Sequence, residues 1–212
     1  MSRYHSIAVA LLVGAVAPLM QGAAPEGGEI IGDDMYVNCQ YRVAAHFPSE
    51  PKFRDITYRD GARTAPAREF YVEEGMARLS VTVVNFTNGP DKDSQLVDSA
   101  VAAFAKRGEM KFNYSVWYDE PNIGGRQFQV ALTDGRALRG SAYMADHRLY
   151  ITEAVADLND FSAFLFEQSV SLIDDKGVDL DSNPVNLAVN GVGTSAGLPN
   201  RQYDCSRLNR RR

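Results

Sequence analysis

Alternation of apolar and polar residues is the feature that most constrains the fold of this 212-residue chain. Residues 77–87 (ARLSVTVVNFT) are rich in β-branched and aromatic side chains, which predicts a strand in the interior of a sheet. Comparable short segments, bounded by Pro, Gly, Asn or Asp, occupy residues 36–47, 53–60, 68–74, 111–120, 126–132, 137–144 and 148–154. A chain made largely of such segments forms a sheet.

Two segments have the helical period of about 3.6 residues instead. The first follows the sequence NGP, with Asp91 or Asp93 placed to cap it and Gly108 placed to end it. Its apolar stripe consists of Leu96, Val97, Ala100, Val101, Ala103 and Phe104. The second helix is predicted from Asp160 to Ile173, capped by Asn159 or Asp160. Its predicted inner side consists of Phe161, Phe164, Leu165, Ser169 and Leu172.

The order of these segments predicts the fold class. Runs of strands interrupted by only two helices are typical of an α+β domain. We therefore expect a twisted, mainly antiparallel sheet of about seven or eight strands covered by two helices. This domain is placed at residues 35–174, after a Gly-rich acidic linker at 25–34. Residues 175–212 lose all periodicity and are interpreted as an extended, partly disordered tail.

The N-terminus has the pattern of a signal peptide. Arg3 precedes an uncharged run from Ile7 to Met20, and the small residues at 22–24 provide a cleavage region. The run is shorter than the roughly 20 residues that a helix needs to span a bilayer. Residues 1–24 therefore predict an exported protein, periplasmic or secreted, without a stable membrane anchor.

Charge and cysteine content narrow the binding partners. The formal net charge is −5, and loss of residues 1–24, which contain one Arg and no acid, makes it more negative. An acidic chain is a poor nucleic-acid binder, so no nucleic-acid partner is expected. Cys39 and Cys205 are predicted to form a disulfide, as a pair of cysteines in an exported protein favours. The alternative is two unpaired thiols. Only His46 and His147 remain to complete a zinc site, and no metal or cofactor is predicted.

One short stretch, residues 131–154, resembles a small acid-base site on paper. It contains Asp134, Asp146, His147, Arg148 and Glu153. Strand register argues against that interpretation, because the apolar residues of neighbouring strands must share one face.

The register predicts two hairpins in this stretch. Leu132 is expected opposite Leu138, across an odd-numbered loop in which Gly135 has a positive φ. Met144 is expected opposite Leu149, which leaves Asp146 and His147 as the centre of a tight turn with positive φ at both. Glu153 is expected opposite Gly140. These residues are therefore interpreted as turn and sheet-end residues, and no catalytic residue is predicted.

Two further residues were considered as site candidates. Ser195 stands in GTSAG at 193–197, which matches the G-x-S-x-G pattern of a nucleophile elbow. No buried strand or amphipathic helix flanks it and no His follows it, so a hydrolase using Ser195 is the weakest hypothesis. Trp117 lies on the more polar side of its strand. It is interpreted as a packing residue, with a ligand-stacking platform as the alternative.

The segments YRVAAHFPSEP, REFYVEE, GGRQFQV, DHRLYITEA and FLFEQSVSL, together with the central helix, resemble exported bacterial proteins of the PsbP-like type over residues 36–173. The resemblance implies an accessory or interaction module without an agreed catalytic centre. We therefore expect a non-catalytic, monomeric accessory or protein-interaction module. Its partner, a protein or a small molecule, is not identified by the sequence. The alternative is a carrier of a small apolar ligand held between helix and sheet.

Overall fold

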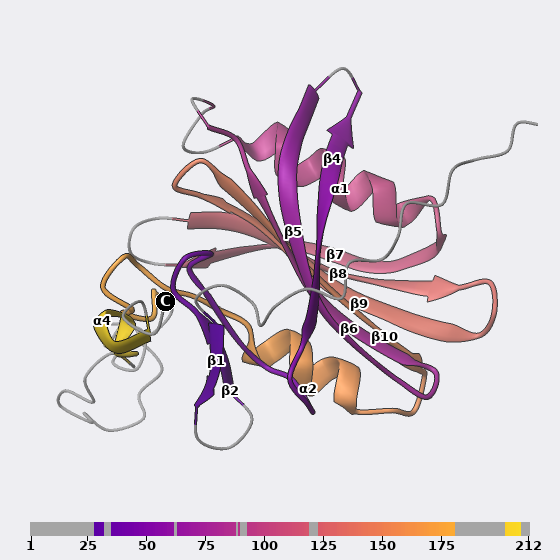
Figure 1. Cartoon of the computed structure of the whole chain (residues 1–212). Helices are drawn as coiled ribbons and strands as arrows, with labels where there is room; N and C mark the ends of the chain where they lie inside the picture. Colours follow the sequence, from indigo (N-terminus) through magenta and orange to yellow (C-terminus); the bar gives the residue numbers. More distant parts are fainter. Residues whose placement is uncertain are drawn as a thin grey trace, which may run out of the picture.

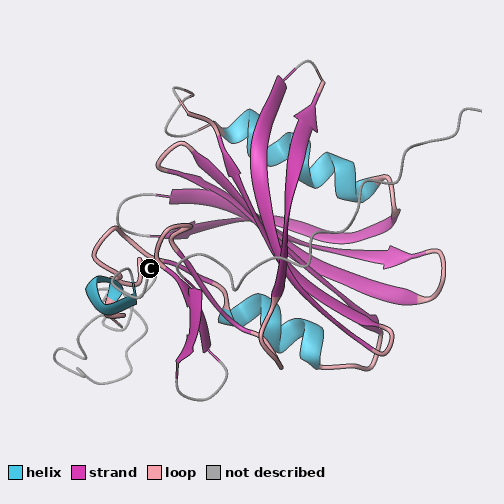
Figure 2. Cartoon of the chain, in the orientation of Figure 1, coloured by secondary structure: helices cyan, strands magenta, loops and turns pink. Residues whose placement is uncertain are grey.

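A seven-stranded antiparallel sheet forms the centre of the computed structural model, which describes residues 28–31, 35–61, 63–87, 89, 93–118, 123–180 and 202–208 (Figures 1 and 2). The strand order is β4-β5-β6-β10-β9-β8-β7, and every neighbouring pair is antiparallel. The strands are β4 (Lys52–Asp60), β5 (Arg63–Glu74), β6 (Ala77–Asn85), β7 (Gly108–Tyr118), β8 (Ile123–Leu132), β9 (Arg136–Ala145) and β10 (Arg148–Asp157). The mainly antiparallel sheet is confirmed, and β6 lies in its interior as predicted.

A second, four-stranded sheet was not predicted. It has the order β1-β2-β3-β11 and consists of β1 (Gly28–Ile31), β2 (Met35–Asn38), β3 (Val43–His46) and β11 (Ser171–Leu172). The prediction of a single strand over residues 36–47 is wrong. The chain reverses between β2 and β3, with Arg42 at a φ of 55°. No Gly or Pro marks this turn, and apolar residues flank it on both sides. β1 lies within the stretch interpreted as a linker.

Helices cover both faces of the large sheet (Figure 2). Helix α1 (Ser94–Ala105) begins as predicted, because the Asp93 carboxylate accepts hydrogen bonds from the backbone N–H groups of Gln95 and Leu96. It buries Leu96, Val97, Ala100 and Val101, whereas Ala103 of the predicted stripe is exposed. Helix α2 (Ser162–Ser169) lies on the opposite face, together with part of the small sheet. A short helix, α4 (Cys205–Leu208), lies near the C-terminus.

Neighbouring residues on the central strands alternate between two cores. On β10, Leu149 packs in the α1 cluster with Phe128 and Leu138, and Tyr150 packs in the α2 cluster with Phe70. This follows from strand geometry, in which successive side chains point to opposite faces. Both faces are therefore covered, by α1 on one side and by α2 with the small sheet on the other.

A third cluster joins the C-terminal segment to the small sheet. Tyr203, Cys205 and Leu208 pack with Val37, and the predicted disulfide between Cys39 and Cys205 is present, with 5.6 Å between the Cα atoms. Part of the segment interpreted as a tail thus contributes to a buried core. The disulfide is consistent with an oxidising compartment. Within the described part of the chain, no helix is long and apolar enough to cross a membrane.

The two hairpins of residues 131–154 are largely as predicted. Met144 faces Leu149, Glu153 faces Gly140, and the φ angles of Asp146 and His147 are 49° and 59°. Gly135 has a φ of 87°, in an odd-numbered loop.

The register predicted for the first hairpin is wrong by two residues. Leu138 lies opposite Val130, not Leu132, because the loop holds three residues, 133–135, instead of five. A shift of two residues leaves the same side chains on the same face, so the apolar pattern fixes only whether the loop is odd or even.

Helix α2 differs from its prediction in length and in orientation. It ends at Ser169, and the apolar residues after it pair with β3 as strand β11. Its buried residues are Ala163, Phe166 and Glu167, whereas Phe161 and Leu165, both predicted to face inward, are exposed. Glu167 was not among the residues of the predicted inner side. Because Glu167 lies on the inner side, the helix is rotated about its axis relative to the predicted orientation.

Candidate functional site

The acid-base cluster suggested by residues 131–154 does not form. Asp134 and the Asp146–His147 turn lie at opposite ends of β9, and a ten-residue strand spans about 33 Å. Asp134 pairs with Arg136 at 2.7 Å, and Asp146 pairs with Arg42. Arg148 donates to the carbonyl oxygen of Gln40 at 3.1 Å. Each charged group has a separate partner, so the prediction that these are turn and sheet-end residues is supported by their placement.

His147 has a contact that the sequence did not indicate. Its ring Nδ1 lies 2.7 Å from the carbonyl oxygen of Gly89, and its own carbonyl oxygen accepts a hydrogen bond from the N–H of Phe86 at 2.9 Å. These contacts tie the β9–β10 turn to the segment between β6 and α1. They hold the turn in place and bring no acid or nucleophile to the ring.

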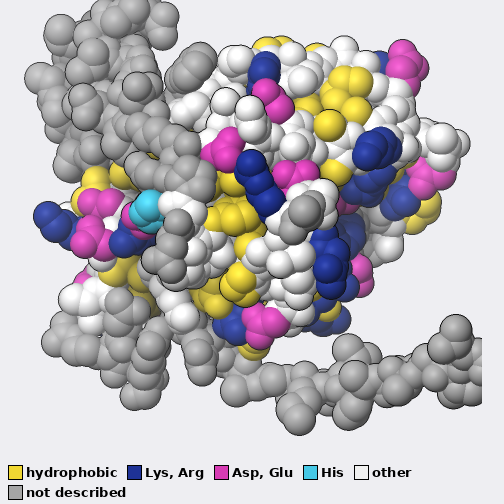
Figure 3. All heavy atoms as spheres, turned by 90° about the horizontal axis from the view of Figure 1, so that it is seen from above, with side chains coloured by type: hydrophobic (Ala, Val, Ile, Leu, Met, Phe, Trp, Pro, Cys, Tyr) yellow, Lys and Arg dark blue, Asp and Glu magenta, His cyan; other side chains and the backbone are white. Residues whose placement is uncertain are grey.

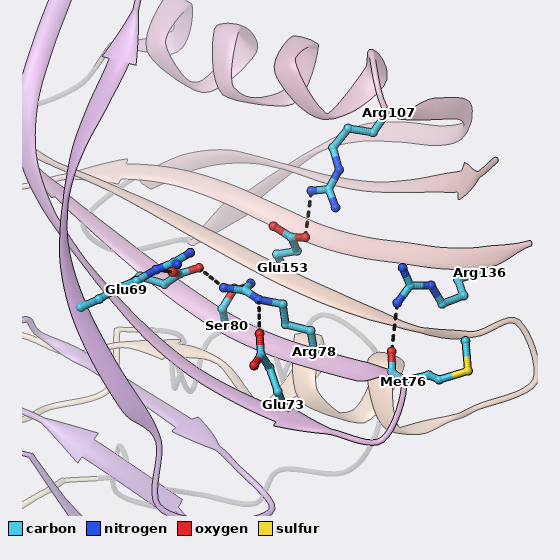
Figure 4. A network of polar contacts seen from close by, with 9 residues as sticks. Glu69, Glu73, Met76, Arg78, Ser80, Arg107, Arg136 and Glu153 are labelled. Carbon is cyan, nitrogen blue, oxygen red and sulfur yellow. Dashed lines mark hydrogen bonds and ion pairs between the residues drawn. The ribbon is translucent and has the colours of Figure 1, made fainter. Parts of the chain in front are cut away.

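Glu153 belongs to a network of ion pairs on the α1 face of the sheet (Figure 4). Arg107, just after α1, binds Glu153 at 2.8 Å, and the buried Glu69 binds both Arg54 and Arg78. Glu73 also pairs with Arg78, at 3.4 Å, so the three carboxylates of this network are matched by three guanidinium groups. The network also lacks a histidine, a thiol or an activated hydroxyl. We interpret it as a structural network of ion pairs that covers the part of this sheet face that α1 leaves uncovered.

The other sequence candidates give little to the site. Trp117 lies on β7 opposite Gly124, and its side chain is outside the described residues. Ser195 lies entirely outside them. In the described ranges, no group of three or more His, Cys, Asp or Glu side chains is arranged to hold a metal ion.

A cavity of about 570 Å³ lies on the opposite face, beside α2. This volume is within the range of small-molecule and side-chain binding pockets. We call it the α2 groove. Its apolar lining comes from the chain after β3, from β5 and β6, and from α2, and includes Phe47, Val72, Ala77, Leu79, Leu165 and Phe166.

Exposed hydrophobic residues occur in the segments that line the α2 groove. Leu165 lines the groove and is 56% exposed. Of the other four large hydrophobic residues that are exposed in the described chain, Met76, Leu158 and Phe161 lie within two residues of a lining residue in the sequence. The Phe161 ring packs against Phe164, with 4.8 Å between the ring centres. Apolar residues that are exposed singly need no explanation, whereas an exposed apolar residue in the lining of a cavity indicates a binding surface.

Contacts at both ends of α2 fix the wall of this groove. The Phe166 ring packs against Phe47, with 5.0 Å between the ring centres. At the C-terminal end, the Ser169 hydroxyl accepts a hydrogen bond from the backbone N–H of His46 at 3.0 Å and donates to the carbonyl oxygen of Phe166 at 2.7 Å. At the N-terminal end, Asp160 accepts a hydrogen bond from the N–H of Ser162 at 2.8 Å. The groove is therefore a preformed feature of the fold.

A buried acid lies under α2, on the side away from the groove. Glu167 is 5% exposed, and burial raises the pKa of its carboxyl, although Gln168 and Arg139 oppose this shift. Arg139, from β9, lies 3.7 Å from Glu167 and stacks over the rings of Phe112 and Phe164. Glu167 Oε1 and Arg139 Nε are buried without a hydrogen-bond partner. This arrangement sets the rotation of α2, and hence which of its residues face the groove.

No family model matches this sequence, and no curated protein matches it. The site therefore rests on the geometry alone. Sequence reasoning missed the α2 groove because it placed Leu165 in the core and gave Glu167 no role. The signal that was present is the exposed stretch DLNDF, at residues 157–161, where Leu158 and Phe161 stand among polar and acidic residues.

Proposed function

We propose that this chain is an exported, non-catalytic binding module of the PsbP-like type, and that it docks an apolar part of a protein partner in the α2 groove. The observation that carries the proposal is the exposed Leu165 in the lining of an apolar cavity, with the exposed Met76, Leu158 and Phe161 within two residues of that lining in the sequence. A surface of this kind is characteristic of interaction sites on monomeric proteins.

A protein partner accounts for the surface better than a small ligand does. A small-molecule site buries most of its ligand, so its apolar residues lie inside the cavity. Here Met76, Leu158 and Phe161 are more than 60% exposed and lie within two residues of lining residues in the sequence. A partner that fills the cavity with one side chain and covers the margin with others would bury all of them. The carrier hypothesis remains the second candidate, and the volume of the cavity favours it.

Export is supported by the signal-like N-terminus and by the Cys39–Cys205 disulfide. A non-catalytic role is supported by the ion pairing of the acid-base candidates in the described residues. On the face drawn in Figure 3, basic and acidic side chains are interspersed, which is not the continuous basic surface of a nucleic-acid binder. We propose a monomer that binds its partner through one surface.

Site-specific photo-crosslinking tests this function. A photoreactive phenylalanine analogue replaces Leu165 in the α2 groove, or Ala103 on the exposed side of α1, and the exporting cells are irradiated. We expect one discrete protein adduct at position 165 and none at position 103. The adduct should disappear when Ala77→Trp fills the groove. Equal adducts at both positions, or an adduct insensitive to Ala77→Trp, would refute the proposal.

A further inference from the structure

The charged residues that line the α2 groove are acidic. Glu74, at the end of β5, and Asp160, just before α2, both line it and are both exposed. No Lys or Arg in the described chain lines the groove. The hydrogen bond from the backbone N–H of Ser162 lowers the pKa of the Asp160 carboxyl, which keeps this group ionised across the neutral range.

Two arginines of neighbouring segments have acidic partners of their own. Arg136 reaches the turn between β5 and β6, where it donates to the carbonyl oxygen of Met76 at 3.0 Å, and it pairs with Asp134. Arg139 lies under α2 with Glu167. Within the described residues, neither Glu74 nor Asp160 forms an ion pair. The two carboxylates therefore give the groove a negative potential, and His46 is the remaining titratable residue of its lining.

Ser162 also lines the groove, and hydrogen bonding by its side chain contributes to the lowered pKa of the Asp160 carboxyl. The α2 groove thus combines an apolar cavity with two carboxylates that form no ion pair within the described residues.

We propose that the occupant of the α2 groove is a basic, amphipathic segment of a partner polypeptide. One aromatic or aliphatic side chain of that segment fills the cavity, and Lys or Arg residues beside it face Glu74 and Asp160. This inference rests on the proposed function and adds the chemistry of the partner.

Three short blocked peptides test the inference with the full folded protein. Their central sequences are Lys-Phe-Lys, Gly-Phe-Gly and Glu-Phe-Glu, and binding is followed by two-dimensional amide NMR with attention to Ala77, Ser162 and Leu165. We expect all shifts to map to these residues. The Lys peptide should bind about tenfold more tightly than the Gly peptide, and the Glu peptide should bind more weakly than the Gly peptide. The preference for Lys should shrink as NaCl is raised, because salt screens exposed charges.

Two variants separate the charge from the cavity. Glu74→Gln combined with Asp160→Asn should remove most of the preference for Lys and leave binding of the Gly peptide unchanged. The matched control is Glu109→Gln, which removes an exposed charge on β7 and should leave the preference intact. If the Lys and Gly peptides bind equally well at the groove, the inference fails and the proposed function stands. If no peptide shifts the groove residues, both fail.

Discussion

Each face of the central sheet is covered by a helix of its own, α1 on one face and α2 on the other, yet the two faces differ in which side chains they leave exposed. On the α1 face, four apolar helix residues are buried in the core, and the rest of the sheet is closed by matched ion pairs around Glu69 and Glu153. On the α2 face, the helix is shorter, buries a carboxyl group, and leaves Phe161 and Leu165 exposed beside a cavity. The first face has these charged groups paired within the chain, whereas the second leaves apolar and charged groups exposed at the α2 groove.

This difference is the basis of the proposed function. A surface whose apolar and charged groups have found partners within the chain has little to gain from a ligand. On the α2 face, the exposed Leu165 lines a cavity that two carboxylates also line, and neither carboxylate forms an ion pair within the described residues. We therefore propose the binding site beside α2.

Removal of the disulfide should have the largest effect on stability. The disulfide lies on the α2 side of the central sheet, where it ties the C-terminal segment to the small sheet. Cys39 and Cys205 are 166 residues apart, and closing so large a loop stabilises a fold by about 5 kcal/mol in the chain-entropy estimate. We expect Cys205→Ser to lower the free energy of unfolding by roughly 2–5 kcal/mol in urea denaturation. Hydrogen exchange should accelerate in β2, β3 and β11 more than in β8 and β9. Uniform acceleration across both sheets would contradict the assignment of the disulfide to the small sheet.

Two leucines on the two helices give the next largest contrast. Leu96 on α1 is 1% exposed and Leu165 on α2 is 56% exposed. Leu96→Ala should therefore cost about 3 kcal/mol, since it leaves a cavity in the core. Leu165→Ala should change the free energy of unfolding by less than about 0.5 kcal/mol. Similar losses in the two variants would show that Leu165 is part of the core and not of an exposed binding surface.

Glu167 should make the free energy of unfolding depend on pH in a characteristic way. Burial raises the pKa of its carboxyl above the ordinary value of 4.5, so the folded state holds this proton more tightly than the unfolded state. Its stabilising contribution is complete below pH 4.5 and is lost as the pH rises through the folded-state pKa. We expect the wild-type protein to lose stability relative to Glu167→Gln over this rise, as measured by denaturation at several pH values. A constant difference between the two proteins would contradict the shift.

His147→Gly should have the smallest effect, because this turn belongs to neither the α1 cluster nor the α2 groove. Glycine adopts the φ of 59° found here without the steric cost that histidine has. The loss of the ring contact with Gly89 offsets part of this gain. We expect a melting temperature that is unchanged or slightly higher. A drop of several degrees would mean that the Gly89 contact outweighs the backbone effect.

Features governed by local pattern were predictable from the sequence. The stripe and cap of α1, the interior position of β6 and the positive φ angles of Gly135, Asp146 and His147 all follow from periodicity and turn chemistry. The pairing of Cys39 with Cys205 followed from their number and the signal-like N-terminus.

Features set by distant contacts were not predictable. The rotation of α2 depends on Arg139 from β9, which allows Glu167 to be buried, and its end depends on β3, which pairs with the residues after it. The α2 groove is formed by segments more than 100 residues apart in the chain, so no local pattern contains it.

The most direct test of the α2 groove is the affinity of the blocked Gly-Phe-Gly peptide for three folded proteins: wild type, Ala77→Trp and Ala103→Trp. Ala77 lines the groove, and Ala103 is exposed on α1. Leu165→Asp, at an exposed position, provides a second groove variant in case Ala77→Trp disturbs folding. We expect the Ala103→Trp variant to bind the peptide as the wild type does, and both groove variants to bind it about tenfold more weakly. Equal affinity in all four proteins would contradict the assignment of the binding site to the α2 groove.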